Sequence, residues 1–413
     1  MKKILSLLLA TVFAFSCLAL ASCGGENVEE LETAPTVENV TDLDPQAPKA
    51  ALICLHGDSS TYDKNFIDAF KTACANKGLS EDDYTIITDI DENEECYQAA
   101  ADFADDGYNV VFADSFGHEP YMINAAKEFP NVQFCHATGT QAHTVNIANF
   151  QNAFASIYEG RFLAGVAAGL KLLEIYDTDN DGAIADEEAK IGYVGAHPYA
   201  EVISGFTSFY LGVKYIVPNV TMEVRYTGEW YDETGEKTTA EALIANGCKL
   251  ISQHADSMGA PTACENANIP NVSYNGATNK TNTFVIASKI NWIPYFEYML
   301  DCVTNGENIK ANWTGTLKNG GVQITAVGEA AAEGTQAKLD EVIAKLNDGT
   351  LKVFDTDTFT VKGEKLTTYL ADVNDYGTFK GDTEVVIDGY FHESEFRSAP
   401  YFDIIIDGIT IVE

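Results

Sequence analysis

Short apolar runs alternate with amphipathic segments through most of the chain, starting near residue 50. The first runs are AALICLHG (50–57), YTIITDI (84–90), NVVFADS (109–115) and VQFCHATG (132–139). The segments between them carry apolar residues at helical spacing. Short buried strands separated by helices predict βαβ units and a parallel sheet whose strands are covered on both faces.

A second series of the same kind follows the helix-like run EGRFLAGVAAGLKLLEIY (159–176). Its strands are predicted in KIGYVGA, TMEVRYTG, KLISQHADS and NVSYNG. Two such series predict an α/β fold with two doubly wound, Rossmann-like lobes. Polar or small residues follow several predicted strands, and ligands of open α/β sheets bind outside the strands' carboxyl ends. We therefore expect one ligand in a cleft between the lobes.

The last hundred residues contain strand-like runs such as LKVFDTDTFTV (351–361) and FDIIIDGITIVE (402–413), with one helical segment, TQAKLDEVIAKLNDG (335–349). We expect this part of the chain to complete the second lobe.

The N-terminus has the pattern of a bacterial lipoprotein signal. A Lys pair precedes an apolar run, and LASC (20–23) resembles a lipobox in which Cys23 becomes the lipidated N-terminus. A plain signal peptide is the alternative. We predict a signal peptide over residues 1–22, an acidic flexible tether over 23–48, and an extracytoplasmic protein that is lipid-anchored to the bacterial cell membrane.

The charge balance narrows the classes of partner. The 413 residues include 25 Lys and Arg against 62 Asp and Glu, a formal charge of −37. Such a surface repels phosphate backbones, so we expect no nucleic-acid partner.

Seven cysteines remain beyond the signal and Cys23, at wide spacings and without a CxxC pair. Buried free thiols are the favoured interpretation, and one or two disulfides stay open.

The segment DTDNDGAIADEE (177–188) has the spacing of an EF-hand calcium loop. The predicted metal ligands are Asp177, Asp179, Asp181, the Ala183 carbonyl and Glu188. Gly182 stands where the loop turns sharply, and Ile184 fills the usual apolar position. A helix precedes the loop, but a strand starts at Lys190, so only half an EF-hand is present. We therefore predict structural calcium on the scaffold and no sensor function.

Four stretches together resemble the basic membrane protein family of bacterial substrate-binding lipoproteins, which includes purine nucleoside receptors of ABC transporters. They are GYNVVFADSFGHEPYMINAAKEFPNVQFCHATG, IYEGRFLAGVAAG, KIGYVGAHPYAEVISGFTSFYLGVK and ALIANGCKLISQHADS. The resemblance implies a type I periplasmic-binding-protein fold. It also implies capture of a purine nucleoside or nucleobase for import through an ABC permease. We expect a monomer, with an N-terminal lobe of 49–150 plus about 285–310 and a C-terminal lobe of 151–284 plus about 311–413.

The resemblance also implies ligand contacts in the stretch DSSTYD, at Asp58, Tyr62 and Asp63. Tyr62 replaces the family's usual Phe and could still stack on a base. Asp63 stands where Asn is usual, which leaves the ligand's identity open. A helix-capping loop is the alternative interpretation of this stretch.

Other candidate ligand contacts follow from strand ends and aromatic residues. They are Asp114, Ser115, Phe116, His197, Trp230, His254, Asp256 and Trp292. Ionised Asp accepts hydrogen bonds only, which suits ribose hydroxyls or purine N–H groups. His254 is equally compatible with a core histidine, and Trp292, near a predicted crossover, with a structural hinge.

No enzyme motif stands out in the sequence. His254, Asp256 and Ser257 lie within four residues, whereas a catalytic triad is assembled from separated positions. We therefore expect a binding protein without a catalytic cofactor. A surface sensor and, more remotely, a nucleoside-processing hydrolase remain as alternatives.

Overall fold

A computed structural model describes residues 44–374 and 380–412. The predicted signal peptide, Cys23 and most of the tether lie outside the described residues, so their predictions stay untested. Within the described ranges, no helix is both long and apolar enough to span a membrane.

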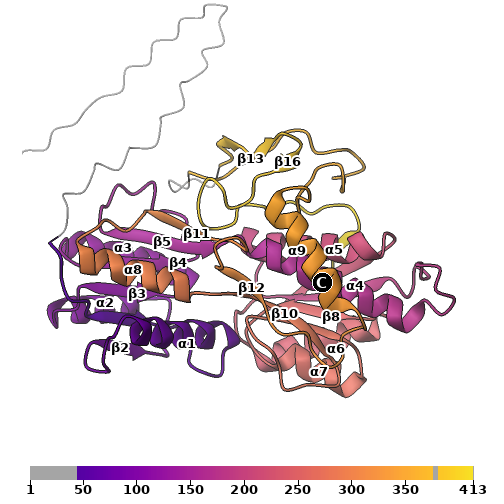
Figure 1. Ribbon diagram of the computed structural model, residues 1–413, viewed down its shortest axis with the longest axis horizontal. Coiled ribbons are helices and arrows are strands. Elements are labelled where there is room, and N and C mark those ends of the chain that lie inside the picture. The colour runs from indigo at the N-terminus through magenta and orange to yellow at the C-terminus, as the bar shows by residue number, and fades with distance from the viewer. Residues whose placement is uncertain (1–43, 375–379, 413) are drawn as a thin grey trace, which may run out of the picture. The chain divides into compact units, whose positions relative to one another are not determined.

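The first lobe is built on a parallel sheet with the strand order β11-β5-β4-β3-β1-β2 (Figure 1). The strands are β1 (Ala50–Ile53), β2 (Tyr84–Ile87), β3 (Val110–Ala113), β4 (Gln133–Ala137), β5 (Phe150–Ala155) and β11 (Asn312–Gly315). Alternate side chains of β1 and β3 enter opposite cores. One core contains α1 (Thr61–Asn76) and α8 (Ile293–Asn305), and the other contains α2 (Glu94–Asp105) and α3 (Glu119–Glu128). This double burial is why β1 and β3 are apolar at every position.

The second lobe has a sheet with the order β12-β10-β9-β8-β6-β7-β17, parallel except for the β10–β12 pair. Its strands are β6 (Lys190–Gly195), β7 (Thr221–Tyr226), β8 (Ile251–His254), β9 (Asn271–Tyr274), β10 (Phe284–Ile290), β12 (Val322–Ile324) and β17 (Ile409–Ile411). The helices α6 (Glu233–Ala245) and α7 (Gly259–Ala267) contribute to a separate core with Val194 and Ile251. The α/β fold with parallel sheets is confirmed.

Two helices of the second lobe approach each other closely through glycines. In α4 (Ile157–Tyr176), a Cβ added to Gly165 would lie 2.1 Å from the carbonyl oxygen of Phe209 in α5 (Ala200–Ile216). A Cβ added to Gly212 would lie equally close, 2.1 Å, to the Phe162 carbonyl. Only glycine permits this backbone contact, so AGVAAG and YLGVK encode a helix–helix packing surface.

The chain crosses between the two sheets after β5, after β10 and after β11. The crossings differ from the expected boundaries by a few residues. The return to the first lobe was expected over about 285–310, but β10 belongs to the second sheet, and the return extends from α8 through β11.

The C-terminal segment contains less regular structure than its sequence predicts. The helix α9 (Thr335–Asp348) forms as expected. The strand-like run 351–361 forms turns, and residues 402–408 are irregular or form a turn before β17. The remaining strands are two residues long: β13 (Leu370–Ala371), β14 (Thr383–Glu384), β15 (Val386–Ile387) and β16 (Tyr390–Phe391). Apolar side chains of this segment, including Phe354, Phe391 and Phe402, nevertheless enter the second lobe's core.

The seven cysteines beyond the N-terminal segment are all buried and free. They are Cys54, Cys74, Cys96, Cys135, Cys248, Cys264 and Cys302. The favoured interpretation of buried free thiols is therefore confirmed for the described residues, and the disulfide alternative is not realised.

Candidate functional site

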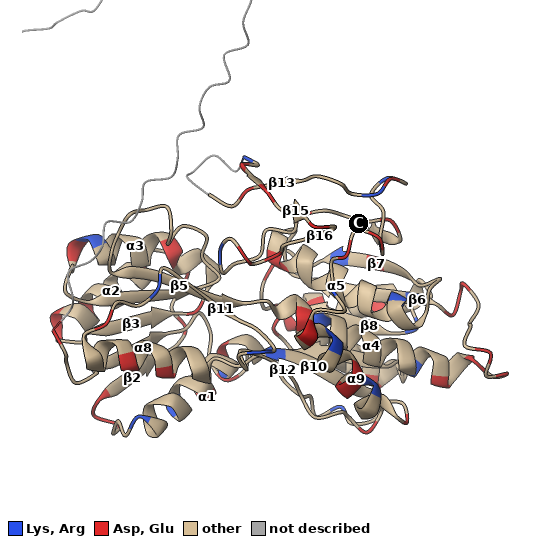
Figure 2. Cartoon of the chain, turned by 45° about the horizontal axis from the view of Figure 1, so that its top comes forward, with Lys and Arg blue, Asp and Glu red and all other residues tan. Residues whose placement is uncertain are grey.

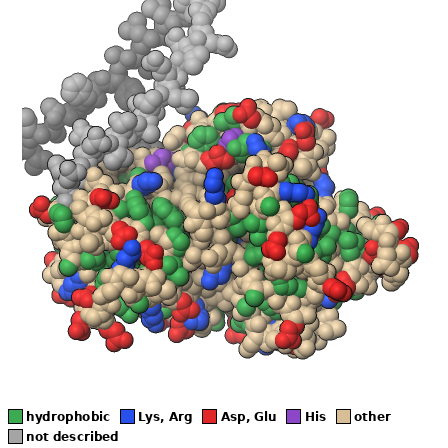
Figure 3. All heavy atoms as spheres, in the orientation of Figure 1, with side chains coloured by type: hydrophobic (Ala, Val, Ile, Leu, Met, Phe, Trp, Pro, Cys, Tyr) green, Lys and Arg blue, Asp and Glu red, His purple; other side chains and the backbone are tan. Residues whose placement is uncertain are grey.

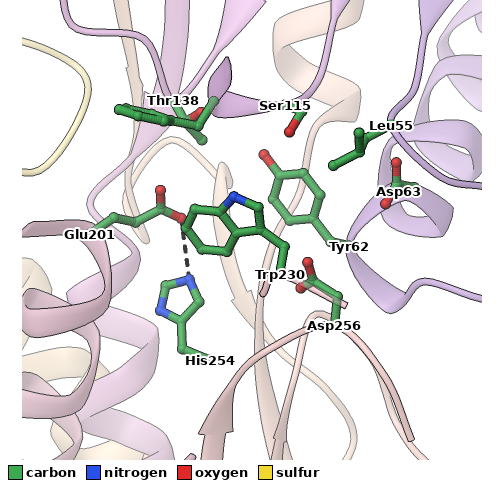
Figure 4. A pocket seen from close by; sticks show the side chains of 10 residues that line it. Leu55, Tyr62, Asp63, Ser115, Thr138, Glu201, Trp230, His254 and Asp256 are labelled. Carbon is green, nitrogen blue, oxygen red and sulfur yellow. Dashed lines mark hydrogen bonds and ion pairs between the residues drawn. The ribbon is translucent and has the colours of Figure 1, made fainter. Parts of the chain in front are cut away.

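A cavity of about 350 Å³ is lined by side chains from both lobes (Figure 4). Its lining residues are Leu55, Tyr62, Asp63, Ser115, Phe116, Thr138, Glu201, Trp230, His254 and Asp256. They lie at or after the ends of β1, β3 and β4 in the first lobe and of β6, β7 and β8 in the second, or in the first turn of the next helix. The cavity therefore has the position expected for a ligand cleft.

The stretch DSSTYD forms both a helix cap and part of the cavity wall. Ser60 caps α1 and accepts a hydrogen bond from the Asp63 backbone N–H. The Asp63 carboxylate accepts hydrogen bonds from the His56 backbone N–H at 2.7 Å and from the Ser60 hydroxyl at 2.5 Å. Tyr62 donates its hydroxyl to the Asp114 carbonyl at 2.7 Å. The helix-capping interpretation thus holds for Asp63, while Tyr62 and Asp63 also line the cavity.

The turns after β3 and β4 form another side of the cavity. The Glu92 carboxylate accepts hydrogen bonds from the Ser115 hydroxyl and the Gly117 backbone N–H, and so fixes the turn that carries Phe116. Thr138 has a φ of +65°, in the left-handed region that a β-branched residue rarely adopts. Such strain is frequently found at ligand sites.

In the second lobe, His254 orients a cavity carboxylate. Its Nε2 lies 3.2 Å from Oε1 of Glu201. Burial and the nearby Arg161 guanidinium lower the pKa of His254 to about 4. The imidazole is therefore neutral near pH 7, and its Nε2–H donates a hydrogen bond to Glu201 in the first turn of α5. The indole of Trp230 lies between Glu201 and Asp256 in Figure 4.

Asp256 differs from the other cavity carboxylates because the described residues supply no hydrogen-bond donor to it. Its side chain is 5% exposed, and Figure 4 shows the carboxylate directed toward Tyr62 and Trp230. Burial raises the pKa of Asp256 well above its usual value, and the neighbouring Asp63, Glu236 and Glu201 carboxylates raise it further. A buried carboxylate without a donor is costly. A ligand that donates hydrogen bonds here would remove that cost.

Several direct contacts join the lobes around the cavity, among them one hydrogen bond and two ring contacts. The Thr61 backbone N–H donates to the Asp256 carbonyl at 3.0 Å. The rings of His56 and Tyr231 lie 5.5 Å apart. Phe116 stacks on Tyr199 with ring centroids 5.5 Å apart. The cavity is therefore enclosed by the lobes in contact with one another.

Four sequence-predicted candidates do not line the cavity. Asp58 is exposed on the loop before α1. Asp114 is buried behind the wall, where its carboxylate accepts the Leu55 backbone N–H. His197 packs edge-on against Trp230 with centroids 4.9 Å apart. Trp292 is 1% exposed in the first lobe's core, stacked 4.3 Å from Phe66, which is the structural role that the sequence left open.

Three cavity residues were not predicted from the sequence: Leu55, Thr138 and Glu201. A signal for Leu55 and Thr138 was present, since both directly follow apolar strand runs. Glu201 lies further from its strand, at the start of α5, where sequence alone does not show which way it points.

The cluster QHADS forms no nucleophile–base pair. His254 is directed to Glu201, and the Ser257 hydroxyl oxygen accepts the backbone N–H of Gly259 at 3.0 Å. The geometry therefore gives no support to the hydrolase alternative.

The loop 177–188 projects between α4 and β6, with acidic residues along it (Figure 2). Carboxylate oxygens of Asp177, Asp179 and Asp181 lie within 4.8 Å of one another. Gly182 has a φ of +83°, which is the conformation that the turn position requires. Asp177 accepts the backbone N–H groups of Asp181 and Gly182, and Glu188 accepts that of Ala185. Oxygen donors in this arrangement suit calcium.

Two lobes of parallel sheet with a polar and aromatic cavity at their strand ends define a solute-binding protein. Residues 57–354 match the Bmp family, described as PnrA-like ABC transporter substrate-binding proteins. Since this match covers most of the chain, the protein belongs to the Bmp family, and the resemblance found in its sequence is confirmed. Proteins of this family are substrate-binding proteins of ABC transporters, not enzymes.

Individual relatives are similar to the chain at moderate identity. A Haloferax volcanii protein, TsgA13, whose name gives it a provisional role as an ABC transporter glucose-binding protein, is 28% identical over 238 residues. That alignment covers 57% of this chain and 56% of the relative. A purine-binding protein of Brucella abortus is 28% identical over 279 residues, 65% of this chain and 72% of the relative. The fold is similar to that of an ABC transporter solute-binding protein from Conexibacter woesei (TM-score 0.58, 20% identity, 74% of this chain and 98% of the other).

Proposed function

We propose that this protein captures a purine nucleoside or nucleobase in the cavity between its lobes and delivers it to an ABC permease. The observation that carries the proposal is Asp256, a buried cavity carboxylate to which the described residues supply no donor. Ribose hydroxyls and purine N–H groups are donors of the required kind.

The rest of the cavity lining supports the same class of ligand. Tyr62, Phe116 and Trp230 provide aromatic rings on which a base could stack, and base–aromatic stacking contributes about 1–3 kcal/mol per base. Asp63 and Glu201 add carboxylates, so the lining repels phosphate groups. We therefore infer an uncharged nucleoside or base, and no nucleotide. The purine-binding relative from Brucella abortus supports the purine assignment.

Delivery to a permease requires an extracytoplasmic position near the membrane. The lipobox at Cys23 would supply an anchor there, and residues 24–48 would give the lobes freedom to move around it. Separation of the lobes would break the contacts at Thr61, His56 and Phe116 and release the ligand by hinge motion.

Trp230 offers a direct test of ligand binding. The chain contains three Trp residues, and of these only Trp230 lines the cavity. We expect adenosine, guanosine, inosine or adenine to change the intrinsic fluorescence in a saturable way. The change should be largely lost in Trp230→Phe, which keeps a ring but removes the indole signal. An unchanged response in Trp230→Phe would place binding elsewhere.

Nucleoside affinity should increase with pH. Because the pKa of Asp256 is raised in the free protein, a fraction of this carboxyl is protonated below that pKa and cannot accept at both oxygens. A donating ligand stabilises the ionised form and lowers the pKa, so binding releases a proton. Glu236, with a pKa raised by burial to about 7, also titrates, but it does not line the cavity. Calorimetry in two buffers of different ionisation enthalpy measures the proton count, and proton uptake would contradict this role of Asp256.

We further propose that loop 177–188 binds calcium with a structural role. The support is its spacing of oxygen ligands and the approach of three carboxylates. Calcium would offset the repulsion among these carboxylates at the junction of α4 and β6.

Figure 3 shows acidic and basic side chains interspersed over the visible face.

The double variant Asp177→Ala/Glu188→Ala should therefore lose the increase in melting temperature that calcium gives the wild type. Nucleoside affinity should change less than about twofold, since the loop lies outside the cavity lining. The variant Asp186→Ala/Glu187→Ala removes the same charge from non-ligand positions of the loop and serves as the control. A large loss of nucleoside affinity in the folded ligand variant would show that the loop contributes to the cleft.

A further inference from the structure

A second, larger chamber opens beside the cavity. Its empty volume is about 1070 Å³, which includes space open to solvent, and it shares Phe116, Thr138 and Glu201 with the cavity as a common wall. Its other lining residues are Thr140, Pro198, Tyr199, Ala200, Asp372, Arg397, Ala399, Pro400, Tyr401 and Asp403. The two spaces are therefore neighbouring compartments at the same interlobe position.

One wall of this outer chamber comes from a part of the chain beyond the family match. The match ends at residue 354, whereas the wall from Asp372 to Asp403 belongs to the C-terminal extension, yellow in Figure 1. Any ligand group that reaches the chamber would contact residues outside the region shared with the family.

Hydrogen bonds to both lobes hold this wall in place. Ser398 donates its hydroxyl to Asn312 of β11 at 3.0 Å and accepts from Asn152 of β5 at 2.7 Å. In the second lobe, Ser204 of α5 donates to Glu393 at 2.5 Å. The extension is thus fixed to the first sheet and to α5 on either side of the chamber.

The lining of the chamber favours an apolar or ring-shaped group without negative charge. Tyr199 is 44% exposed although it is a large aromatic residue, and Pro198, Pro400 and Ala399 add apolar surface. Three lining carboxylates face a single guanidinium, that of Arg397. The nitrogens of Arg397 donate to the backbone carbonyls of Val373, Ala399 and Pro400, which makes it a support for the wall. A phosphate group would be repelled here.

We propose that the outer chamber is a second subsite, which accommodates an uncharged apolar or ring-bearing substituent on the ligand of the inner cavity. The physiological ligand would then be a substituted purine nucleoside, longer than adenosine. This inference rests on the proposed function, because it extends the ligand assigned to the inner cavity. The chamber would contribute affinity by removing the apolar substituent from water.

Calorimetry with ligands extended at either end of the nucleoside tests this subsite. The probes are adenosine, N6-benzyladenosine, 5′-deoxy-5′-methylthioadenosine and AMP. We expect one of the two apolar extensions to bind about tenfold more tightly than adenosine, equivalent to ~1.4 kcal/mol, and AMP to bind more weakly. Failure of adenosine, guanosine, inosine and adenine alike to bind would overturn the proposed function together with this inference. Adenosine binding without a gain from either extension would overturn the inference alone.

Filling the chamber provides the matched variant. Ala200 lines the chamber and has no side-chain polar group, so Ala200→Trp adds volume without removing a hydrogen bond. In Ala200→Trp the extended ligand should no longer bind more tightly than adenosine, whereas in Ala200→Ser it still should. The adenosine affinity of both variants should stay within about threefold of the wild-type value. If Ala200→Trp no longer binds adenosine, Asp403→Trp fills the chamber from the exposed end of the extension. If the extended ligand still binds more tightly than adenosine when the chamber is filled, the proposal is overturned.

Discussion

Asp256→Asn should weaken purine nucleoside binding by roughly 10- to 150-fold, because a hydrogen bond to a charged group contributes about 1.5–3 kcal/mol. The variant should also be at least as stable as the wild type without ligand. Asp256 lies buried among Asp63, Glu201 and Glu236, which raise its pKa together with desolvation. The Asn side chain has the same shape but no charge, so it removes both the desolvation cost and the repulsion from the neighbouring carboxylates. Affinity and stability should thus change in opposite directions, as expected for a group that serves the ligand.

Asp58→Asn is the control, because Asp58 is an exposed carboxylate near the cavity that does not line it. Titration calorimetry gives the affinities, and thermal unfolding without ligand gives the stabilities. If Asp256→Asn binds nucleosides as the wild type does, or loses stability strongly, Asp256 has a structural role and the ligand's donors lie elsewhere.

Trp292→Ala should destabilise the first lobe by about 3–5 kcal/mol, the usual cost of removing a fully buried large aromatic side chain. Trp292 is 1% exposed and lies among Phe66, Phe112, Phe154 and Tyr295. It precedes α8, where the chain enters the first lobe from β10. Its loss would leave a cavity between α1, α8 and the sheet.

The midpoint of denaturant unfolding measures this effect. Phe396→Ala, at a large apolar residue that is 42% exposed, is the control and should shift the midpoint little. The sequence also offered Trp292 as a platform for a base. If Trp292→Ala kept its stability and lost nucleoside affinity, that role would be supported and the role in the core would be contradicted.

The fold could be predicted where burial alone decides the pattern. β1 and β3 are covered on both faces, so their sequences are continuous apolar runs. β4 and β8 are equally buried but contain polar residues. Strands were predicted wrongly in the C-terminal segment because its apolar residues alternate as in a strand. Residues such as Val353 and Phe359 enter the core from turns that are not paired with a neighbouring strand. Periodicity reports which side chains are buried and does not show whether a strand partner is available.

The site could be predicted as far as strand ends determine it. Tyr62, Ser115, Phe116, Trp230, His254 and Asp256 were expected and line the cavity together with Asp63. Their convergence follows from parallel strands ending at the same edge. Trp292 also follows a strand, but the chain crosses between lobes there and the side chain enters the first lobe's core. Such a crossing depends on long-range packing, which the local sequence does not contain.

Calorimetric titration of the purified protein with purine nucleosides and with glucose tests the central claim most directly. The relatives are named for both kinds of ligand, a purine and a sugar. An aromatic cavity with an unpartnered carboxylate predicts saturable binding of at least one of adenosine, guanosine, inosine and adenine, with no comparable heat from glucose. Binding of glucose without binding of any purine would contradict the assigned ligand class.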